Sequence, residues 1–513
     1  MIRTLSKTEH KLSGTLDTAD CFRILILYFI FLLSIGYSFG AGDMVELLPY
    51  ARQLSDPSLY PQDFFIQHII QYPINERVVF ASLIALCQSS ALLPYWCFAI
   101  HALSSIALIA AWYCIIRHYQ FGKNQSALLI ILCFVLLYGI NLGGNELYYN
   151  FCVSSLSAKA ICSWAFLAFL RRRNIAASLL LGVSVFIQPI VGLQLFLIFS
   201  GIIFIQLVQK RETPKSLLQF AFPFTVIAGF WIFQLYSNYA AQNIDKDLFL
   251  EIIRFRLPHH FLPSYFPIKS YLVLVPLAII GCLCWFRNDI RIGFFFILAF
   301  CGTIIYAIGV EKFELTTLLS SQWFKIWIWL KPLSILGIAL QLRNRGLPEK
   351  LQFLSKIEGK FYVILFILLC LRVPLSTQYF ANNSAEIDCA LAAKKLTARD
   401  AVFVIPASNS SFKYYSERSC YIDYKSMIHK QEVMPIWYQR IREVYKSDLA
   451  NAGPAFGNVA IADQHLREIS RTDLIKLRDL GVQYVMDFNT GNENQIPAIY
   501  SNDKYIIYDL SKL

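Results

Sequence analysis

FRILILYFIFLLSIGYSFG, at residues 22–40, has Arg23 as its only charged residue. An α-helix needs about 20 mostly apolar residues to cross the roughly 30 Å of hydrocarbon in a bilayer, so this stretch predicts a membrane-spanning helix. Ten further apolar runs follow along the chain. They are residues 95–116, 126–140, 152–170, 174–188, 191–208, 217–237, 270–286, 292–310, 319–342 and 361–378. The sequence therefore predicts a polytopic α-helical membrane protein with about eleven spans.

The composition of the 513-residue chain agrees with this architecture. Apolar residues make up 56% and charged residues only 16%, whereas about 25% of a typical soluble domain is charged. The mean hydropathy is +0.49. These values exclude a water-soluble enzyme, a disordered chain and a small disulfide-rich protein. The net charge of +12 is typical of the Lys and Arg that membrane proteins keep in cytoplasmic loops, so we expect no nucleic acid as a partner.

The distribution of Lys and Arg predicts which helix ends face the cytoplasm, because these residues resist translocation. Most of them fall inside if residues 1–21 form a cytoplasmic N-terminus, and the run from Arg171 to Arg173 then also lies inside. Residues 77–93 are apolar too, but a crossing there would move this run outside. We therefore expect 77–93 to form a helix that lies at the outer interface of a bacterial inner (plasma) membrane or dips into the membrane and returns to the same side.

The composition changes after residue 380, at the end of the membrane part (22–380). Residues 381–513 lack a long apolar run and alternate strand-like segments with polar helical ones, as small α/β domains do. An odd number of crossings places this C-terminal domain in the periplasm, where Cys389 and Cys420 could form a disulfide or remain free thiols. The predicted strands are 400–406, 420–425, 482–488 and 504–510, and the predicted helices lie around 429–450 and at 471–481.

The first loop (residues 41–94) is acidic and is expected to lie outside. Asp43 follows the first span directly and Glu46 comes three residues later, so the two carboxylates share a face if the segment is helical. Asp63 lies further along, among Tyr and Pro residues. A carboxylate at the membrane surface can act as a base or hold a divalent cation such as Mg²⁺ or Mn²⁺. The alternative is a solvated loop whose acids have no catalytic role.

A second group of polar residues, RFRLPHH at 254–260, is also expected on the outer side. Arg254 and Arg256 could bind a lipid phosphate, since the guanidinium fork fits phosphate oxygens. His259 and His260 could supply an acid, a base or a metal ligand. The alternative is an interfacial loop whose side chains contact lipid headgroups.

Two lysines fall within predicted spans, where an ionised side chain is costly and usually faces a cavity or a partner. Lys159 and Lys325 both lie towards the outer ends of their spans. Together with the two arginines, they could line an outward-facing cavity suited to a polyprenyl phosphate, although Lys325 could instead extend to the headgroups. Asn145 and Glu146 follow a pair of Gly residues and could hydrogen-bond sugar hydroxyls or cap a helix.

The segment 411–425, SFKYYSERSCYIDYK, is expected to form a strand pair, although its Tyr rings could also stack on a sugar. The sequence contains no nucleotide-binding signature and no cluster of Cys and His with zinc spacing. We therefore predict no organic cofactor. A divalent cation at the acidic loop is the one cofactor that the sequence leaves open.

The chain resembles the GT-C superfamily of integral-membrane glycosyltransferases. The resemblance lies in the first span and the acid that follows it, the DPSLYPQDF segment at 56–64, the later PHH segment and the α/β domain at the end of the chain. Within that superfamily they resemble a group of bacterial multi-pass proteins. The resemblance implies a polyprenyl-phosphate-linked sugar as donor. It implies that Asp43 is the base that deprotonates the acceptor hydroxyl, with Glu46 as its neighbour and Asp63 as the second acid of the loop.

The sequence thus predicts an inverting glycosyltransferase that acts on a glycan, lipid or protein acceptor at the outer leaflet. This function requires Asp43 to share a cavity with the PHH segment and at least one cation. Two other functions stay open. A transporter or flippase for a lipid-linked glycan often shows paired repeats, which are not visible in the sequence. The third is a non-catalytic assembly partner with a GT-C-like fold.

Overall fold

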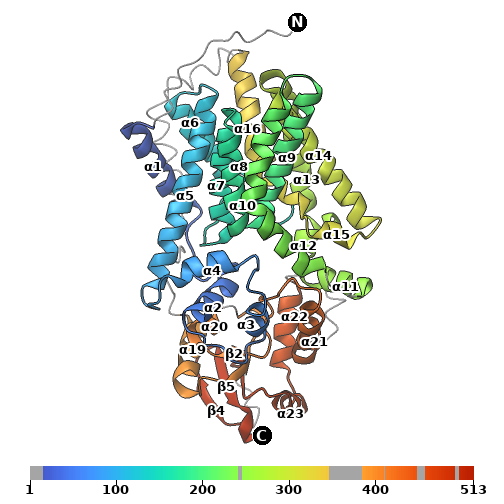
Figure 1. The fold of residues 1–513 in the computed structure, drawn as a ribbon. Coiled ribbons are helices and arrows are strands. Elements are labelled where there is room, and N and C mark those ends of the chain that lie inside the picture. The colour runs from blue at the N-terminus through green and yellow to red at the C-terminus, as the bar shows by residue number, and fades with distance from the viewer. Residues whose placement is uncertain (1–15, 241–244, 346–383, 410, 447–456, 491–495) are drawn as a thin grey trace.

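The computed structural model describes residues 16–240, 245–345, 384–409, 411–446, 457–490 and 496–513. A body of helices lies at one end of the molecule and a smaller α/β domain at the other (Figure 1). The short helices α2 (Met44–Ser55), α3 (Phe64–Ile69) and α4 (Val78–Ala85) lie at the junction between them (Figure 1). The first loop therefore forms part of the contact between the two parts.

The helical body is that of a multi-pass membrane protein. Six of its helical segments are long and apolar enough to cross a membrane: α5 (Leu93–His118), α9 (Pro189–Val208), α10 (Pro214–Ala240), α13 (Ile268–Asn288), α14 (Ile290–Glu311) and the segment Thr316–Asn344, which contains α16 (Trp327–Asn344). Shorter helices are α1 (Thr18–Ser34), α6 (Lys123–Ile131) with the π-helical η1 (Leu132–Leu136), α7 (Ser154–Leu170) and α8 (Asn174–Ile187). Ten of the predicted runs coincide with these helices. The run 361–378 and the boundary at 380 lie outside the described residues.

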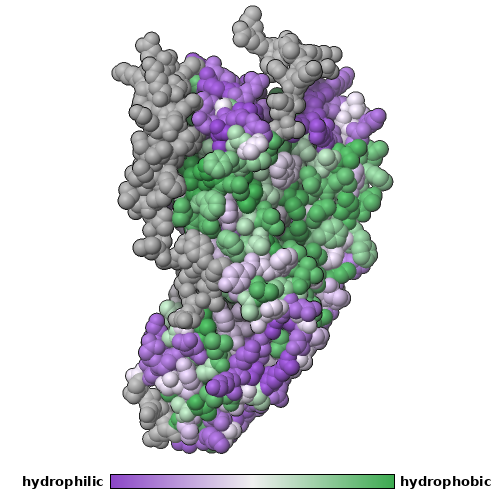
Figure 2. All heavy atoms as spheres, turned by 90° about the vertical axis from the view of Figure 1, so that its left-hand side faces the viewer, coloured by the Kyte–Doolittle hydropathy of each residue, from purple (hydrophilic) through white to green (hydrophobic). Residues whose placement is uncertain are grey.

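The surface of the helical body is apolar where a bilayer would surround it. Figure 2 shows a broad belt of hydrophobic side chains around the middle of the visible face, with hydrophilic side chains above it and over the C-terminal domain below. α10 presents one such face, since five of its side chains at a spacing of three or four residues are each between 62 and 66% exposed. These are Leu218, Phe222, Val226, Phe230 and Phe233. Such a stripe suits contact with lipid chains.

Residues 77–93 do not form a spanning helix. α4 has eight residues, which corresponds to a length of about 12 Å, well short of the thickness of a bilayer. A turn then leads into α5, which begins at Leu93. This arrangement fits the predicted helix at the interface.

The C-terminal domain has the predicted α/β architecture. Its five-stranded sheet has the order β2-β1-β3-β5-β4, with β1 parallel to β2 and β3, and β5 antiparallel to β3 and β4. The strands are β1 (Val402–Val404), β2 (Ser419–Cys420), β3 (Tyr484–Phe488), β4 (Ala498–Ser501) and β5 (Tyr505–Asp509). The helices are α19 (Ala385–Leu396), α20 (Phe412–Ser416), α21 (Val433–Tyr445), α22 (Gly457–Arg467) and α23 (Arg471–Asp479). Cys389 and Cys420 are free thiols within an apolar core of this domain.

The strand pair predicted over 411–425 is wrong. The segment begins with α20, whose Phe412 N–H donates to the Asn409 carboxamide oxygen at 3.2 Å, and only β2 joins the sheet. The strand predicted at 420–425 ends early because the Asp423 carboxylate accepts the backbone N–H groups of Lys425 (2.7 Å) and Ser426 (3.1 Å). Such bonds from an Asp side chain bend the chain into a turn.

Candidate active site

Asp43 is the residue that precedes α2, nine residues after α1 ends at Ser34. Gly42 precedes it with a φ of +57°, and the ring of Phe151 fills the space that a Cβ at Gly42 would need. The Asp43 side chain accepts no hydrogen bond from the backbone of α2 within the described residues. It is 61% exposed. The carboxylate is therefore accessible to a ligand.

Two ammonium groups lie near this carboxylate, one from each part of the molecule. Nζ of Lys425, in the C-terminal domain, is 3.9 Å from Oδ1 of Asp43. Lys325, in the short helix η3 (Trp323–Ile326) before α16, interacts electrostatically with Asp43. Both lysines are partly exposed. Within the ranges that the structure describes, neither ammonium donates a hydrogen bond, so both retain donors for an anion.

The other predicted cations are already engaged in contacts within the protein. The Lys159 ammonium is buried, donates to the Glu146 carbonyl at 2.6 Å and lies 4.3 Å from the centre of the Tyr149 ring. Arg254 is exposed on α11 (Lys246–Arg256) and pairs with Glu314 at 3.1 Å. Arg256 is buried, and its guanidinium donates to two backbone carbonyls of the C-terminal domain, those of Tyr424 (3.0 Å) and Lys425 (3.2 Å).

Glu46 lies one helical turn after Asp43, close enough for the two charges to interact. It is buried and forms a two-pronged contact with Arg77, whose Nε and Nη2 lie 2.9 and 2.7 Å from Oε2. Burial raises the pKa of the Glu46 carboxyl, and Arg77 opposes this rise. Arg77 also donates to the Met427 carbonyl at 3.3 Å. The pair therefore ties α2 and the first loop to the C-terminal domain.

Asp63 is only 1% exposed and lies in the interface between the first loop and the C-terminal domain. Its carboxylate caps α3 by accepting from Ile66 N–H at 3.0 Å, and it accepts from Cys420 N–H at 2.9 Å. Nζ of Lys413 lies 3.6 Å away. Asp63 is thus part of this interface, and the structure does not bring it into the polar group around Asp43.

The two histidines of the PHH segment form the short helix α12 (Pro258–Phe261), with ring centres 4.1 Å apart. The Nδ1–H group of His260 donates to the Gly143 carbonyl at 3.1 Å, next to Gly144, whose φ is +64°. Burial, with help from Arg256 and Lys425, lowers the pKa of His259 to about 4. Burial also lowers the pKa of His260, with contributions from His259 and Lys325. Both rings are therefore neutral at pH 7.

His429 is a third histidine in this region and belongs to the C-terminal domain. Its ring lies 6.4 Å from the ring of Phe261. Burial, followed by the charge of Arg77, lowers its pKa to about 4, and Lys325 and Arg256 act in the same direction. Neutral His429 therefore lies beside α12, where the C-terminal domain meets the membrane part.

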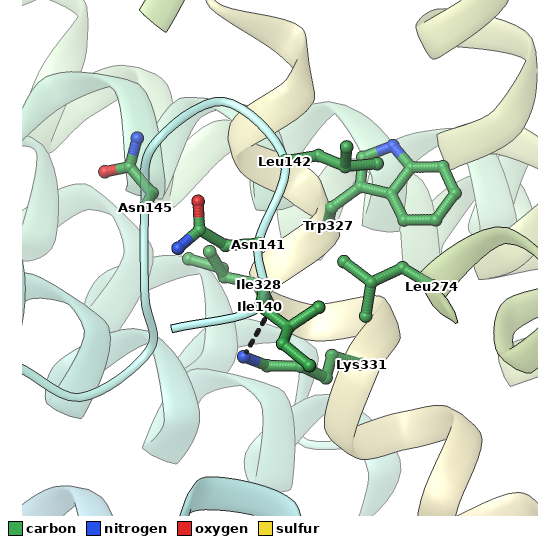
Figure 3. A pocket seen from close by; sticks show the side chains of 8 residues that line it. All are labelled: Ile140, Asn141, Leu142, Asn145, Leu274, Trp327, Ile328 and Lys331. Carbon is green, nitrogen blue, oxygen red and sulfur yellow. Dashed lines mark hydrogen bonds between the residues drawn. The ribbon is translucent and has the colours of Figure 1, made fainter. Parts of the chain in front are cut away.

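Asn145 and Glu146 are buried in the loop before α7. The Asn145 carboxamide donates to the Gly143 carbonyl at 2.7 Å and accepts from the Tyr149 hydroxyl at 3.0 Å. Glu146 forms a buried ion pair with Lys331 of α16 at 2.7 Å. A small pocket beside this pair is lined by Ile140, Asn141, Leu142, Asn145, Leu274, Trp327, Ile328 and Lys331. In Figure 3 the Lys331 ammonium points to the backbone of Ile140, to which it donates at 3.1 Å. Asp43 does not line this pocket.

Four residues of this region were not predicted from the sequence: Arg77, Lys331, Lys425 and His429. Lys331 had a signal, because it lies within a predicted span just as Lys325 does. Lys425 ends the Tyr-rich segment 411–425, and nothing in the sequence indicated that Lys425 or His429 lies beside the first loop. In the described part of the chain, no group of three or more His, Cys, Asp or Glu side chains is arranged to hold a metal ion, and a divalent cation stays a prediction.

Comparisons with known proteins add the following. The family that matches is described as a domain of unknown function (DUF6798), and its model matches residues 384–444, which span α19 to α21. The search among curated proteins gave no match. Among solved structures, the chain is similar to ArnT from Cupriavidus metallidurans, crystallised with bound undecaprenyl phosphate. The identity is 12% and the TM-score 0.39, over 96% of this chain and 97% of that chain.

A second similar structure is an oligosaccharyltransferase from Archaeoglobus fulgidus, crystallised with a tethered acceptor peptide. Here the identity is 12% and the TM-score 0.34, over 87% of this chain and 72% of that chain. Likeness of this degree assigns no role to any residue, so the roles proposed below depend on the contacts of this chain.

Proposed function

We propose that the protein is a GT-C-like membrane glycosyltransferase that moves a sugar from a polyprenyl-phosphate donor to an extracytoplasmic acceptor. One observation carries the proposal: the accessible carboxylate of Asp43 lies 3.9 Å from the Lys425 ammonium and interacts electrostatically with that of Lys325, and both ammonium groups retain hydrogen-bond donors. A base next to an anion site is what a transferase with a phosphate leaving group requires.

In the proposed reaction Asp43 takes the proton from an acceptor hydroxyl of a glycan, lipid or protein. The acceptor oxygen then attacks the anomeric carbon from the face opposite the phosphate, so that the configuration inverts. As the new C–O bond forms, the bond between the sugar and the phosphate breaks, and its electron pair leaves with the polyprenyl phosphate. The Lys325 ammonium stabilises the negative charge that develops on the phosphate.

The other predicted residues support this geometry. Glu46 holds Arg77 and fixes α2, while Asp63 fixes α3 against the C-terminal domain. Lys159 and Arg256 hold the backbone on two sides of the site, and Arg254 pairs with Glu314 at the surface. We propose that neutral His259 and His260, with Asn145 and Glu146 behind them, form the wall that faces the sugar.

We also propose that the protein lies in a bacterial inner membrane, with the N-terminus in the cytoplasm and the C-terminal domain in the periplasm. α2 to α4 and the C-terminal domain lie at the same end of the helical body, away from α6 (Figure 1). A lipid-linked donor in the outer leaflet would therefore meet an acceptor at the junction between the two parts.

The proposal is tested by incubating the purified protein in detergent with polyprenyl-phosphate-linked sugars and measuring the released lipid phosphate. Release that depends on protein and acceptor supports it. Movement of an intact lipid-linked sugar across a proteoliposome membrane, with no release, would favour the transporter or flippase instead. Absence of both activities would favour the non-catalytic assembly partner.

A further inference from the structure

Lys425 is the one side chain of the C-terminal domain that forms an ion pair with Asp43 in the described ranges. It is about one third exposed, at 33%, and its ammonium also interacts electrostatically with Glu46 and His259. A lysine on a flexible surface segment would have no fixed position relative to the membrane part. The question is therefore what holds Lys425 at this site.

The turn that carries Lys425 is fixed from within the C-terminal domain. Asp423 accepts the backbone N–H groups of Lys425 and Ser426 and the Ser426 hydroxyl at 2.6 Å. Asp423 is itself held by the Lys413 ammonium at 2.9 Å. The Asp423 carboxylate is therefore held by Lys413 while it binds the backbone of the turn, and this fixes the conformation of the turn.

The same lysine links the turn to the first loop. Lys413 lies 3.6 Å from Asp63, which caps α3 and accepts the Cys420 N–H. We name these three buried side chains, Asp63, Lys413 and Asp423, the junction triad. The triad begins in the loop that also contains Asp43 and ends at the turn that contains Lys425. It therefore fixes the two ends of the ion pair relative to each other.

The membrane part holds the turn from its other side. The Arg256 guanidinium donates to the carbonyls of Tyr424 and Lys425 and lies 5.4 Å from the centre of the Tyr424 ring. The turn is thus bound on both sides, while the Lys425 ammonium remains partly exposed. A fixed backbone with an unsatisfied ammonium is the arrangement expected of a preorganised anion ligand.

We propose that Lys425 and Lys325 together form a phosphate-binding site shared between the C-terminal domain and the membrane part, whose ligand is the phosphate of the lipid donor. This inference rests on the proposed function and adds that the C-terminal domain supplies a binding residue. Each ammonium would donate to a different phosphate oxygen beside Asp43. Removal of the domain's contribution would therefore weaken donor binding, even though the domain lies outside the membrane part.

The experiment measures binding of undecaprenyl phosphate to the full-length protein in detergent, by native mass spectrometry, for Lys425→Ala, Lys425→Arg and Lys325→Ala. Loss of one charge-assisted hydrogen bond should weaken binding by about tenfold or more, and Lys425→Arg should recover most of it. The control is Lys446→Ala, which removes an exposed lysine of the same domain that pairs with Asp473. It should bind as the unmodified protein does. Unfolding temperatures show whether each variant is folded.

Two further arms identify the source of the phosphate. Inorganic phosphate and phosphatidylglycerol are each added as competitors. Displacement of undecaprenyl phosphate by inorganic phosphate at low concentration, or by phosphatidylglycerol, would contradict a site built for the lipid donor. If Lys425→Ala is folded and binds undecaprenyl phosphate normally, the shared site is refuted, whereas the proposed function still stands provided that Asp43→Asn loses transfer. If Asp43→Asn keeps transfer, the proposed function fails independently of the binding result.

Discussion

The Lys413 ammonium lies 2.9 Å from the Asp423 carboxylate, and the two side chains are only 2 and 4% exposed. The Lys413 ammonium lies 5.2 Å from the centre of the Phe65 ring in the first loop, from which Asp63 adds a second carboxylate. The nearby carboxylates raise the pKa of Lys413 despite the opposing effect of burial, so it remains charged. The interface between the membrane part and the C-terminal domain thus has a charged centre.

We predict that Lys413→Met destabilises this interface. The substitution leaves two buried carboxylates without their cation, which typically costs about 3–5 kcal/mol. Thermal unfolding and protease sensitivity of the C-terminal domain would measure the effect. Lys446→Ala, at an exposed pair, should change stability by less than about 1 kcal/mol. An unfolding temperature for Lys413→Met equal to that of the unmodified protein would contradict the prediction.

A second prediction concerns the ion pair within the membrane part. Glu146→Gln should destabilise the protein by about 3–5 kcal/mol, because the buried Lys331 loses its counter-charge. The double variant Glu146→Gln/Lys331→Met removes both charges and should recover part of the loss. Thermal unfolding in detergent tests this order of stabilities. The proposed coupling of Glu146 and Lys331 is contradicted if the double variant loses more free energy of unfolding than the two single variants lose in sum.

The neutral histidines predict a pH dependence. His259 and His429 have pKa values lowered from 6.5 to about 4, so the unfolded chain binds more protons than the folded chain between these values. Stability should therefore fall as the pH drops from 6.5 towards 4. The double variant His259→Gln/His429→Gln should lose less stability on acidification, as measured by the unfolding temperature. His465→Gln, in α22, serves as the control, and an unchanged pH profile in the double variant would count against the assignment.

Gly144 offers a test of the wall around His260. Its φ of +64° disfavours any other residue, and a Cβ there would lie 2.7 Å from Nδ1 of His260. Gly40 is a matched control, because its φ is +78° and nothing lies within 4 Å of its Cβ position. Each change to Ala should cost about 1–2 kcal/mol for the backbone alone, but only Gly144→Ala should also reduce transfer. Equal transfer rates in the two variants would show that transfer does not depend on the position of the His260 ring.

Much of the fold could be predicted from the sequence, because burial in a bilayer imposes a strong and local composition. The α/β domain could be predicted because its strands, such as 482–488, bury apolar residues and therefore have a recognisable local composition. The strand pair at 411–425 failed because side-chain contacts override strand propensity there. The Asn409 carboxamide accepts the first N–H group of α20, and Asp423 turns the chain after β2.

The site was only partly predictable. Asp43 was predicted as the base from its place after the first span and from the GT-C resemblance; the structure shows its carboxylate exposed beside Lys425, and its role stays a prediction. The sequence could not distinguish Lys159 and Arg256, which donate to backbone carbonyls, from Lys325, whose ammonium donates no hydrogen bond within the described residues. It also gave no indication of Lys425, since the contact with Asp43 joins residues far apart in the chain. Such contacts depend on the tertiary arrangement and leave no local pattern.

The central claim is that Asp43 is the catalytic base, and the transfer rate of Asp43→Asn tests it most directly. Asp56→Asn, at an exposed acid of the same loop that pairs with Arg399, is the matched control. The account predicts that Asp43→Asn folds and inserts normally but loses transfer by about 10²–10⁴-fold, while Asp56→Asn remains active. Transfer by Asp43→Asn at the rate of the unmodified protein would contradict it.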